Sequence, residues 1–151
     1  MVKFWFKFLA VFAFVIVTDQ AIKQLFLNGF GWEGEYLSLV LTYNTGVAFS
    51  MFSFLGQYLK GVGVLILGGL FIYLLYEKTL LKAHWLAFAL LLGGGMSNLI
   101  DRFLHPGVVD YVFWHKWFEF AVFNFADVMI NLAVAIIFIQ VLCSYLKRRK
   151  I

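Results

Sequence analysis

Four long apolar segments dominate this sequence and restrict the fold that the chain can adopt. They cover about residues 4–18, 57–76, 83–100 and 128–146, and the last two contain no charged side chain. A helix needs about 20 mostly apolar residues to cross a bilayer, and flanking polar side chains that reach the interface bring each segment to that length. The chain is 64% hydrophobic and 13% charged, which is too apolar for a water-soluble domain of this size. We therefore expect an all-α membrane protein with four transmembrane helices, formed as a single domain over residues 1–151.

The charged residues assign an orientation to these spans. No small-x-small cleavage site follows the first segment, so we expect it to stay in the chain as a span. Four spans place both termini on one side, together with eight of the twelve basic residues: Lys3, Lys7, Lys78, Lys82, Lys147, Arg148, Arg149 and Lys150. The positive-inside rule makes that side cytoplasmic. Every acidic residue except Glu77 then lies at the opposite face, which indicates that the extracytoplasmic face carries the chemistry.

Two extracytoplasmic segments, about residues 25–55 and 103–124, are long enough to hold structure of their own. In residues 37–43 apolar side chains alternate with smaller or polar ones, a pattern typical of a β-strand. Asn-Thr-Gly turn chemistry follows, and Val47–Met51 is a candidate for the return strand. The second segment is crowded with aromatic residues, which suit the headgroup zone of a membrane. We expect a small β-sheet on the membrane surface.

Two acids in this region have structural interpretations that require no function. Asn124 and Asp127 nearly match a capping box at the start of the fourth span, where a carboxylate also suits the helix dipole. Asn131, one turn further along, extends this polar face beyond what a cap needs. Asp110 follows the sequence PGVV and, taken alone, is a solvated loop acid.

The end of the third span and the end of the first span carry further charges. Three consecutive glycines in the third span let another helix approach it closely. Asn98, Asp101 and Arg102 share one helical face. Asp101 opposes the dipole at a helix C-terminus and therefore needs a cationic partner, either Arg102 or Lys23. These residues can form a structural ion pair at the interface or can have a functional role, and both interpretations stay open. Asp19 and Lys23 can likewise serve only to anchor the first span.

Several kinds of site are missing from the sequence. There is no H-E-x-x-H motif, and the predicted topology places His84 opposite His105 and His115, so the three histidines cannot share a metal ion. Neither Ser50 nor Ser97 lies in a G-x-S-G setting or has a nearby histidine base, so a serine nucleophile is not expected. The basic C-terminal residues suit anionic lipid better than nucleic acid. We therefore expect no metal, no cofactor and no nucleic-acid partner.

Two carboxylates in unlike environments are sufficient for peptide hydrolysis. An ionised one deprotonates water, while a protonated one polarises the scissile carbonyl and later supplies the leaving amine. The acids of the outer face provide such a set.

Five short motifs, in this order, resemble those of the bacterial lipoprotein signal peptidases, or type II signal peptidases. TDQAIK resembles D-Q-x-x-K, NTGVAFS resembles N-x-G-x-A-F, GGGMSNLIDR resembles G-G-x-x-G-N-x-x-D-R, GVVDY resembles G-x-V-x-D-F, and FNFADVMI resembles F-N-x-A-D-x-x-I. The resemblance covers nearly the whole chain. Members of that family are inner-membrane aspartyl peptidases that cleave prolipoproteins just before the cysteine that carries diacylglyceryl.

The resemblance implies a fold and a set of site residues. The fold would be four transmembrane helices with a small extracytoplasmic β-cradle and a short extracytoplasmic helix. The catalytic pair would be Asp110 and Asp127. The substrate or the pair would be oriented by Asn44, Gly46, Asn98, Arg102 and Asn124, and Asp19, Lys23 and Asp101 would support the site. Three positions depart from the family pattern, with Ser97 in place of Gly, Ala121 in place of Pro and Tyr111 in place of Phe.

The implied substrate is a prolipoprotein with a diacylglyceryl cysteine, whose acyl chains stay in the membrane lipid. We expect a monomer in the bacterial cytoplasmic membrane, with both termini cytoplasmic and the active site at the extracytoplasmic face. The aromatic stretch Val112–Phe123 is then a candidate for a mobile flap over the pair.

Two rival interpretations are open. Intramembrane aspartyl peptidases of the presenilin or prepilin-peptidase type carry a G-x-G-D signature, which is absent here. A small transporter or assembly factor that binds cations would need acids deep within its spans, whereas these acids lie at the outer ends.

Overall fold

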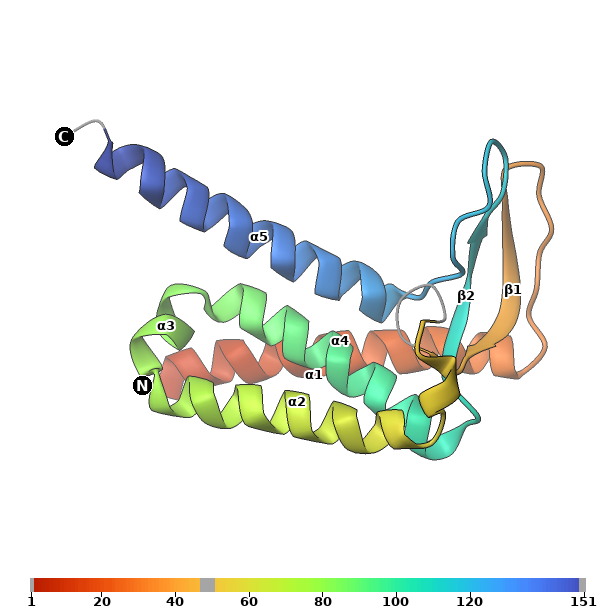
Figure 1. The fold of residues 1–151 in the computed structure, drawn as a ribbon, viewed down its shortest axis with the longest axis horizontal. Helices are drawn as coiled ribbons and strands as arrows, with labels where there is room; N and C mark the ends of the chain where they lie inside the picture. Colours follow the sequence, from red (N-terminus) through yellow and green to blue (C-terminus); the bar gives the residue numbers. More distant parts are fainter. Residues whose placement is uncertain (1, 47–50, 150–151) are drawn as a thin grey trace.

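The computed structural model describes residues 2–46 and 51–149 and consists mostly of helix. In chain order the elements are α1 (Val2–Leu27), β1 (Leu37–Asn44), the 3-10 turn η2 (Ser53–Leu55), α2 (Tyr58–Tyr76), α3 (Lys78–Ala83), α4 (Trp85–Leu104), β2 (Val108–Trp114) and α5 (Phe125–Arg148). The long helices run alongside one another, and the two strands lie at one end of the bundle (Figure 1). α1 begins and α5 ends at the other end (Figure 1).

Each of the four predicted apolar segments falls within a long helix. By length and composition, α2 and α5 are the two helices in the described part of the chain that can cross a membrane. Both turn large apolar side chains outward, among them Leu65, Ile72 and Phe138. Exposed apolar surface of this extent is unusual for a soluble monomer and is expected next to lipid.

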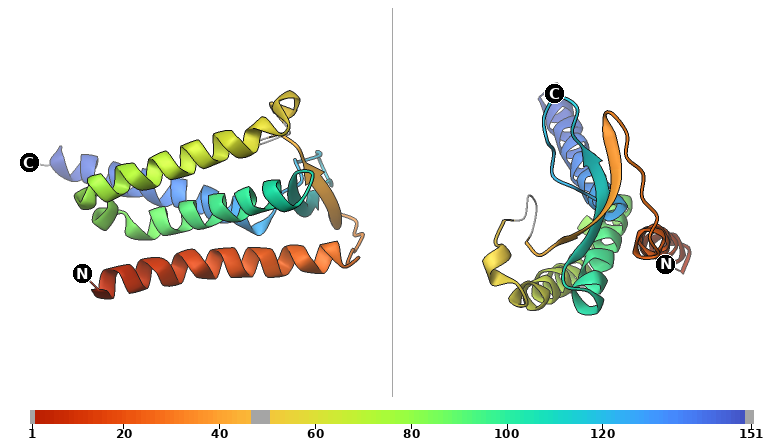
Figure 2. Two further views of the ribbon diagram at one scale, coloured as in Figure 1. Left: turned by 90° about the horizontal axis from the view of Figure 1, so that it is seen from below. Right: turned by 90° about the vertical axis from the view of Figure 1, so that its right-hand side faces the viewer.

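Helix α4 lies at the centre of the bundle, between α1, α2 and α5 (Figure 2). Its three consecutive glycines face three different neighbours. A Cβ on Gly93 would lie 3.0 Å from the Cβ of Val15 in α1, one on Gly94 would lie 2.7 Å from the Ala126 carbonyl in α5, and one on Gly95 would lie 2.6 Å from Leu67 in α2. The predicted close approach of helices at the glycines is therefore confirmed, and it involves three partners.

The strand predicted over residues 37–43 is confirmed as β1, but its partner differs from the prediction. β1 pairs antiparallel with β2, in a register that runs from Leu37 opposite Trp114 to Asn44 opposite Val108, with an irregularity between Leu39 and Thr42. Of the predicted return strand, residues 47–50 lie outside the described part and Met51 lies in a turn. The aromatic and β-branched residues of β2, which we attributed to the headgroup zone, also have high strand propensity.

Two helix boundaries also differ from the predictions. α1 continues nine residues past the predicted end of the first span, because the charged side chains of Asp19 and Lys23 pair within the helix. α4 begins at Trp85, two residues past the predicted start of the third apolar segment, and Ala83 is the last residue of the short helix α3. η2 is a single turn of 3-10 helix at the sheet end of the described chain, and the short extracytoplasmic helix implied by the resemblance stays a prediction.

Candidate active site

A buried lysine lies beneath the candidate site. The ammonium of Lys23 is 2.6 Å from Asp19 Oδ2, 2.6 Å from Asp101 Oδ2 and 2.9 Å from Asn98 Oδ1. The Lys23 side chain is only 1% exposed, and these three acceptors match its three N–H donors. Lys23 is therefore the partner that Asp101 required, and the interpretation of Asp19 and Lys23 as surface anchors is wrong.

The two carboxylates around Lys23 also hold the backbone beside each candidate catalytic aspartate. Asp19 Oδ1 accepts the backbone N–H of Ala126, which precedes Asp127, at 2.9 Å. Asp101 Oδ2 accepts the N–H of Val109, which precedes Asp110, at 3.0 Å. The polar groups of α1 and α4 thus fix the start of α5 and the start of β2 relative to each other.

Two neighbouring residues that sequence reasoning did not assign to the site complete this network. Gln20 Nε2 donates to Asp101 Oδ1 at 2.8 Å. The buried hydroxyl of Ser97 donates to Asp19 Oδ2 at 2.7 Å and accepts from Gln20 at 3.0 Å. Ser97, a departure from the family pattern, therefore adds a donor at the helix interface. A glutamine one residue after Asp19, at the end of an apolar span, was the available signal for Gln20.

Asn98 and Asn124 connect the lysine to both candidate aspartates. Asn98 Oδ1 accepts from Lys23 and from Asn124 Nδ2, the latter at 3.0 Å. Asn98 Nδ2 donates to Asp127 Oδ1 at 2.8 Å, and Asn124 Nδ2 donates to Asp110 Oδ1 at 2.7 Å. A continuous chain of hydrogen bonds therefore orients one carboxylate on α5 and one on β2.

Asn124 and Asp127 also form the helix cap that the sequence predicted. Asp127 N donates to Asn124 Oδ1 at 2.8 Å, and Asn124 N donates to Asp127 Oδ2 at 3.2 Å. This reciprocal capping box fixes the first turn of α5. Asp127 Oδ1 meanwhile receives Asn98, so the same carboxylate caps the helix and faces the site.

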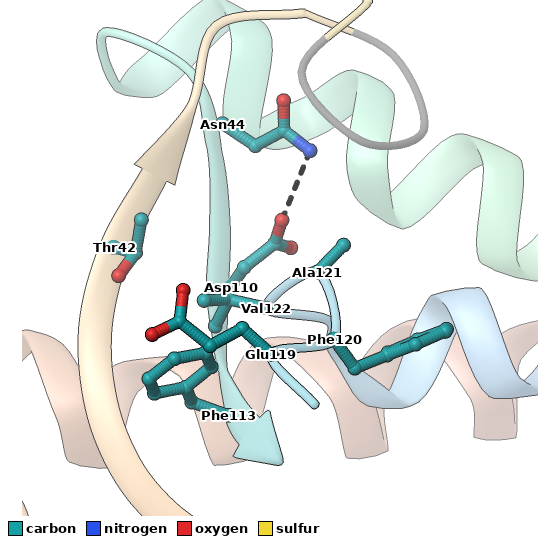
Figure 3. Close-up of a pocket in the computed structure, with 8 residues that line it drawn as sticks. All are labelled: Thr42, Asn44, Asp110, Phe113, Glu119, Phe120, Ala121 and Val122. Carbon is teal, nitrogen blue, oxygen red and sulfur yellow. Dashed lines mark hydrogen bonds between the residues drawn. The ribbon is translucent and has the colours of Figure 1, made fainter. Parts of the chain in front are cut away.

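Asp110 is not a solvated loop acid, because it lies within β2 and is only 1% exposed. Asn124 donates to its Oδ1, and Asn44 Nδ2 donates to its Oδ2 at 3.1 Å (Figure 3). Burial, together with the nearby charge of Asp127, raises the pKa of Asp110 to about 7. A carboxyl with such a pKa can hold a proton near neutral pH, as an acid catalyst requires.

Arg102 acts on Asp110 through the backbone of the first outer segment. Its guanidinium donates to the Gly46 carbonyl, and Gly46 N donates to Asn44 Oδ1 at 3.0 Å. Because Asn44 in turn donates to Asp110, these residues position one face of the carboxylate. The structure thus brings together all ten site residues expected from the sequence: Asp19, Lys23, Asn44, Gly46, Asn98, Asp101, Arg102, Asp110, Asn124 and Asp127.

Tyr111, another departure from the family pattern, fills a structural position next to the site. Its ring stacks on Phe26 of α1 with centroids 4.3 Å apart. Its hydroxyl accepts the backbone N–H of Phe125, the first residue of α5, at 3.0 Å. The residue that follows Asp110 therefore satisfies an amide that the helix itself leaves without a partner.

Both aspartates line one cleft of about 500 Å³, together with Asn98, Arg102, Ile130 and Asn131. A neighbouring cavity of about 310 Å³ is lined by Thr42, Asn44, Asp110 and Glu119 (Figure 3). Residues 120–122 border both spaces. Within residues 2–46 and 51–149, no group of three or more His, Cys, Asp and Glu side chains is placed to hold a metal ion.

The aromatic stretch after β2 folds back along that strand and borders the cleft. Phe123 N donates to the Val112 carbonyl at 3.1 Å, and Phe120 N donates to the Trp114 carbonyl at 2.9 Å. At its tip, Trp117 and Phe118 are exposed. At this position the stretch can cover the two aspartates. That it moves as a flap stays a prediction.

Known proteins resemble this chain over nearly its full length. The family model described as "Signal peptidase (SPase) II" matches residues 11–143. A lipoprotein signal peptidase of Campylobacter jejuni subsp. jejuni serotype O:2 is 55% identical over 148 residues, which are 98% of this chain and 93% of the relative. That of Wolinella succinogenes is 54% identical over 131 residues, 87% of this chain and 90% of the relative. That of Helicobacter acinonychis is 47% identical over 146 residues, which are 97% of this chain and 93% of the relative.

Two solved structures share this fold. Both are described as bacterial membrane enzymes studied by the in meso method, and both are 25% identical to this chain with a TM-score of 0.75. One alignment covers 93% of this chain and 88% of the other, and the second covers 90% and 92%. The arrangement of helices and strands around the cleft is therefore that of known membrane enzymes.

Proposed function

The chain belongs to the signal peptidase II family, and on that premise we propose that it removes the signal peptide from prolipoproteins whose cysteine already carries diacylglyceryl. The cut falls just before that cysteine. Asp110 and Asp127 are the catalytic pair. The observation that carries this proposal is that a single residue, Asn124, hydrogen-bonds both carboxylates while both line one cleft.

The proposed mechanism needs one proton shared by the two carboxyls. The ionised member takes a proton from a water molecule as the water oxygen attacks the scissile carbonyl. The protonated member donates a hydrogen bond to that carbonyl oxygen and then gives its proton to the amine as the C–N bond breaks. Both members act jointly, so the proton belongs to the pair. The raised pKa of Asp110 supports this arrangement.

The proposal also includes the membrane setting. All four long helices cross the bacterial cytoplasmic membrane as a monomer, with both termini in the cytoplasm and the sheet at the extracytoplasmic face. In support, α1 begins and α5 ends at one end of the bundle while the sheet lies at the other (Figure 1). The cleft continues from the aspartates to Ile130 and Asn131, one turn along α5. A lipid-modified substrate can therefore keep its acyl chains in the bilayer while its peptide reaches the pair.

The substrate assignment is tested with the purified protein in detergent and a prolipoprotein presented with or without its diacylglyceryl group. We expect cleavage of the modified form and a product mass that corresponds to a cut just before the lipidated cysteine. Little cleavage of the unmodified form is expected, because the acyl chains supply much of the binding energy. Equal rates on both forms, or a cut at another bond, would show that the assigned substrate is wrong.

The pH dependence of cleavage follows from the pKa of Asp110. Burial and the charge of Asp127 raise this pKa to about 7, so the proton that the pair shares is lost as the pH rises above that value. We expect kcat/KM to fall about tenfold per pH unit above this point, measured up to about pH 9. Protein returned from the highest pH to about pH 6 should regain its activity, which separates titration from unfolding. A rate that stays constant over this range would contradict a shared proton.

A further inference from the structure

A second cleft, separate from the one that holds the aspartates, lies where the start of α2 meets the end of α4. Its volume is about 290 Å³, and neither Asp110 nor Asp127 lines it. α2 contributes Lys60, with Gln57 just before the helix, and α4 contributes Arg102 and Phe103. These helix ends lie at the sheet end of the bundle (Figure 1), which is the extracytoplasmic side in the proposed topology.

The residues that line this second cleft are basic or uncharged. Lys60, Arg102 and His105 line it, and none of its lining residues is acidic. Among the described residues, neither Lys60 nor Arg102 forms a salt bridge within 4.0 Å. The Lys60 ammonium lies 5.9 Å from the centroid of the Phe103 ring, close enough for the ring to hold it beside the cleft. The carboxylates of Asp110, Asp101 and Asp127 act on the charge of Arg102, but none of them lines this cleft. The cations that face the cleft therefore favour an anionic ligand.

The donor set at this cleft suits an oxyanion. A guanidinium carries five N–H donors in a fixed plane. In Arg102, Nη2 donates one hydrogen bond to the Gly46 carbonyl. Arginine and lysine together are a common combination for phosphate. The amide of Gln57 offers a further donor on the same side.

The surroundings indicate that the anion is attached to a lipid. Phe103 and Leu104, next to the cleft, are 59% and 68% exposed, and Phe54 of η2 is 81% exposed. The outward apolar face of α2 runs from this cleft along the bundle. A ligand with a charged head and long apolar chains matches both surfaces, whereas a free ion matches only the cleft.

We propose that this second cleft binds the phosphodiester of an anionic phospholipid, with its acyl chains along α2 and α4. Arg102 lines both this cleft and the cleft of the aspartates. A bound phosphate would hold the guanidinium that donates to Gly46 and, through Asn44, would steady Asp110. This binding does not depend on the proposed peptidase activity.

The test is lipid binding by the full-length protein, measured by native mass spectrometry after release from detergent. Dioleoyl phosphatidylglycerol and dioleoyl phosphatidylcholine are compared at equal concentration, with inorganic phosphate as a competitor in a third arm. We expect more phosphatidylglycerol bound than phosphatidylcholine, and no displacement by an equal concentration of phosphate. Equal retention of the two lipids, or displacement by phosphate, would overturn the proposal; the latter outcome would assign the cleft to a free anion.

Matched variants locate the site. Lys60→Gln should weaken phosphatidylglycerol binding about fivefold, and addition of His105→Gln should weaken it further. Lys116→Gln removes a cation from the same end of the molecule, but one that pairs with Glu35 away from the cleft, and it should leave binding unchanged. Lys60 is exposed, and His105 and Lys116 are partly exposed, so all these variants should keep the wild-type circular dichroism spectrum. If Lys116→Gln weakens binding as much as Lys60→Gln, general surface charge and not the cleft attracts the lipid.

Discussion

Replacement of either Asp110 or Asp127 by Asn is expected to reduce the rate of prolipoprotein cleavage by about 10³-fold or more, since each removes one half of the acid–base pair. Asparagine has nearly the same shape but can neither accept the proton from water nor supply one to the amine. Single-turnover kcat/KM, followed by the mass of the products, measures the loss. The double variant should be little slower than either single one, because groups that act as a unit are not additive.

A matched control is available in the neighbouring cavity. Glu119 lines it beside Asp110 and is exposed, so Glu119→Gln should keep nearly full activity. Each asparagine variant must also unfold at a temperature close to that of the wild type. If Asp110→Asn or Asp127→Asn kept more than about a tenth of the activity, the assignment of that residue to the pair would be wrong.

Lys23→Met is expected to have the largest effect on stability. Removal of the ammonium leaves the carboxylates of Asp19 and Asp101 buried, each 0% exposed, without the cation that neutralises them. Breaking a buried pair in this way costs roughly 3–5 kcal/mol. The free energy of unfolding by denaturant in mixed micelles, compared with the wild type, measures the change.

Lys116→Met supplies the control for this variant. Lys116 pairs with Glu35 at the surface, and an exposed pair contributes less than about 1 kcal/mol. Addition of Asp101→Asn to Lys23→Met should recover part of the lost stability, because one uncompensated charge is removed. Equal stabilities for Lys23→Met and Lys116→Met would mean that the buried ammonium is not holding the helices together.

Features set by local sequence were predictable. The apolar segments located the four long helices, and alternation in residues 37–43 located β1. The pattern of Asn124 and Asp127 predicted the capping box. Gly93–Gly95 predicted close helix packing, although not that each glycine would face a different helix. In all these cases the signal lies within a few turns of chain.

Features that depend on distant pairing were not predictable from local pattern. Asp110 looked solvated because nothing near it in the sequence shows that Val108–Trp114 pairs with β1. Asp101 clearly needed a cation, but Arg102 and Lys23 were equal candidates, and only the packing of α1 on α4 selects Lys23. The roles of Gln20 and Ser97 depend on the same helix interface. Strand pairing and helix packing join residues that are far apart in the chain, which a local pattern does not specify.

Hydrolysis by two carboxylates without a metal ion is tested most directly by one measurement, the initial rate of cleavage after dialysis against a chelator. The protein and the diacylglyceryl-modified prolipoprotein are treated together, and the mass of the released product is followed over time. The two-aspartate mechanism predicts the same rate as for untreated protein. A rate that is lost in chelator and restored by added Zn²⁺ would contradict it and would assign the activation of water to a metal.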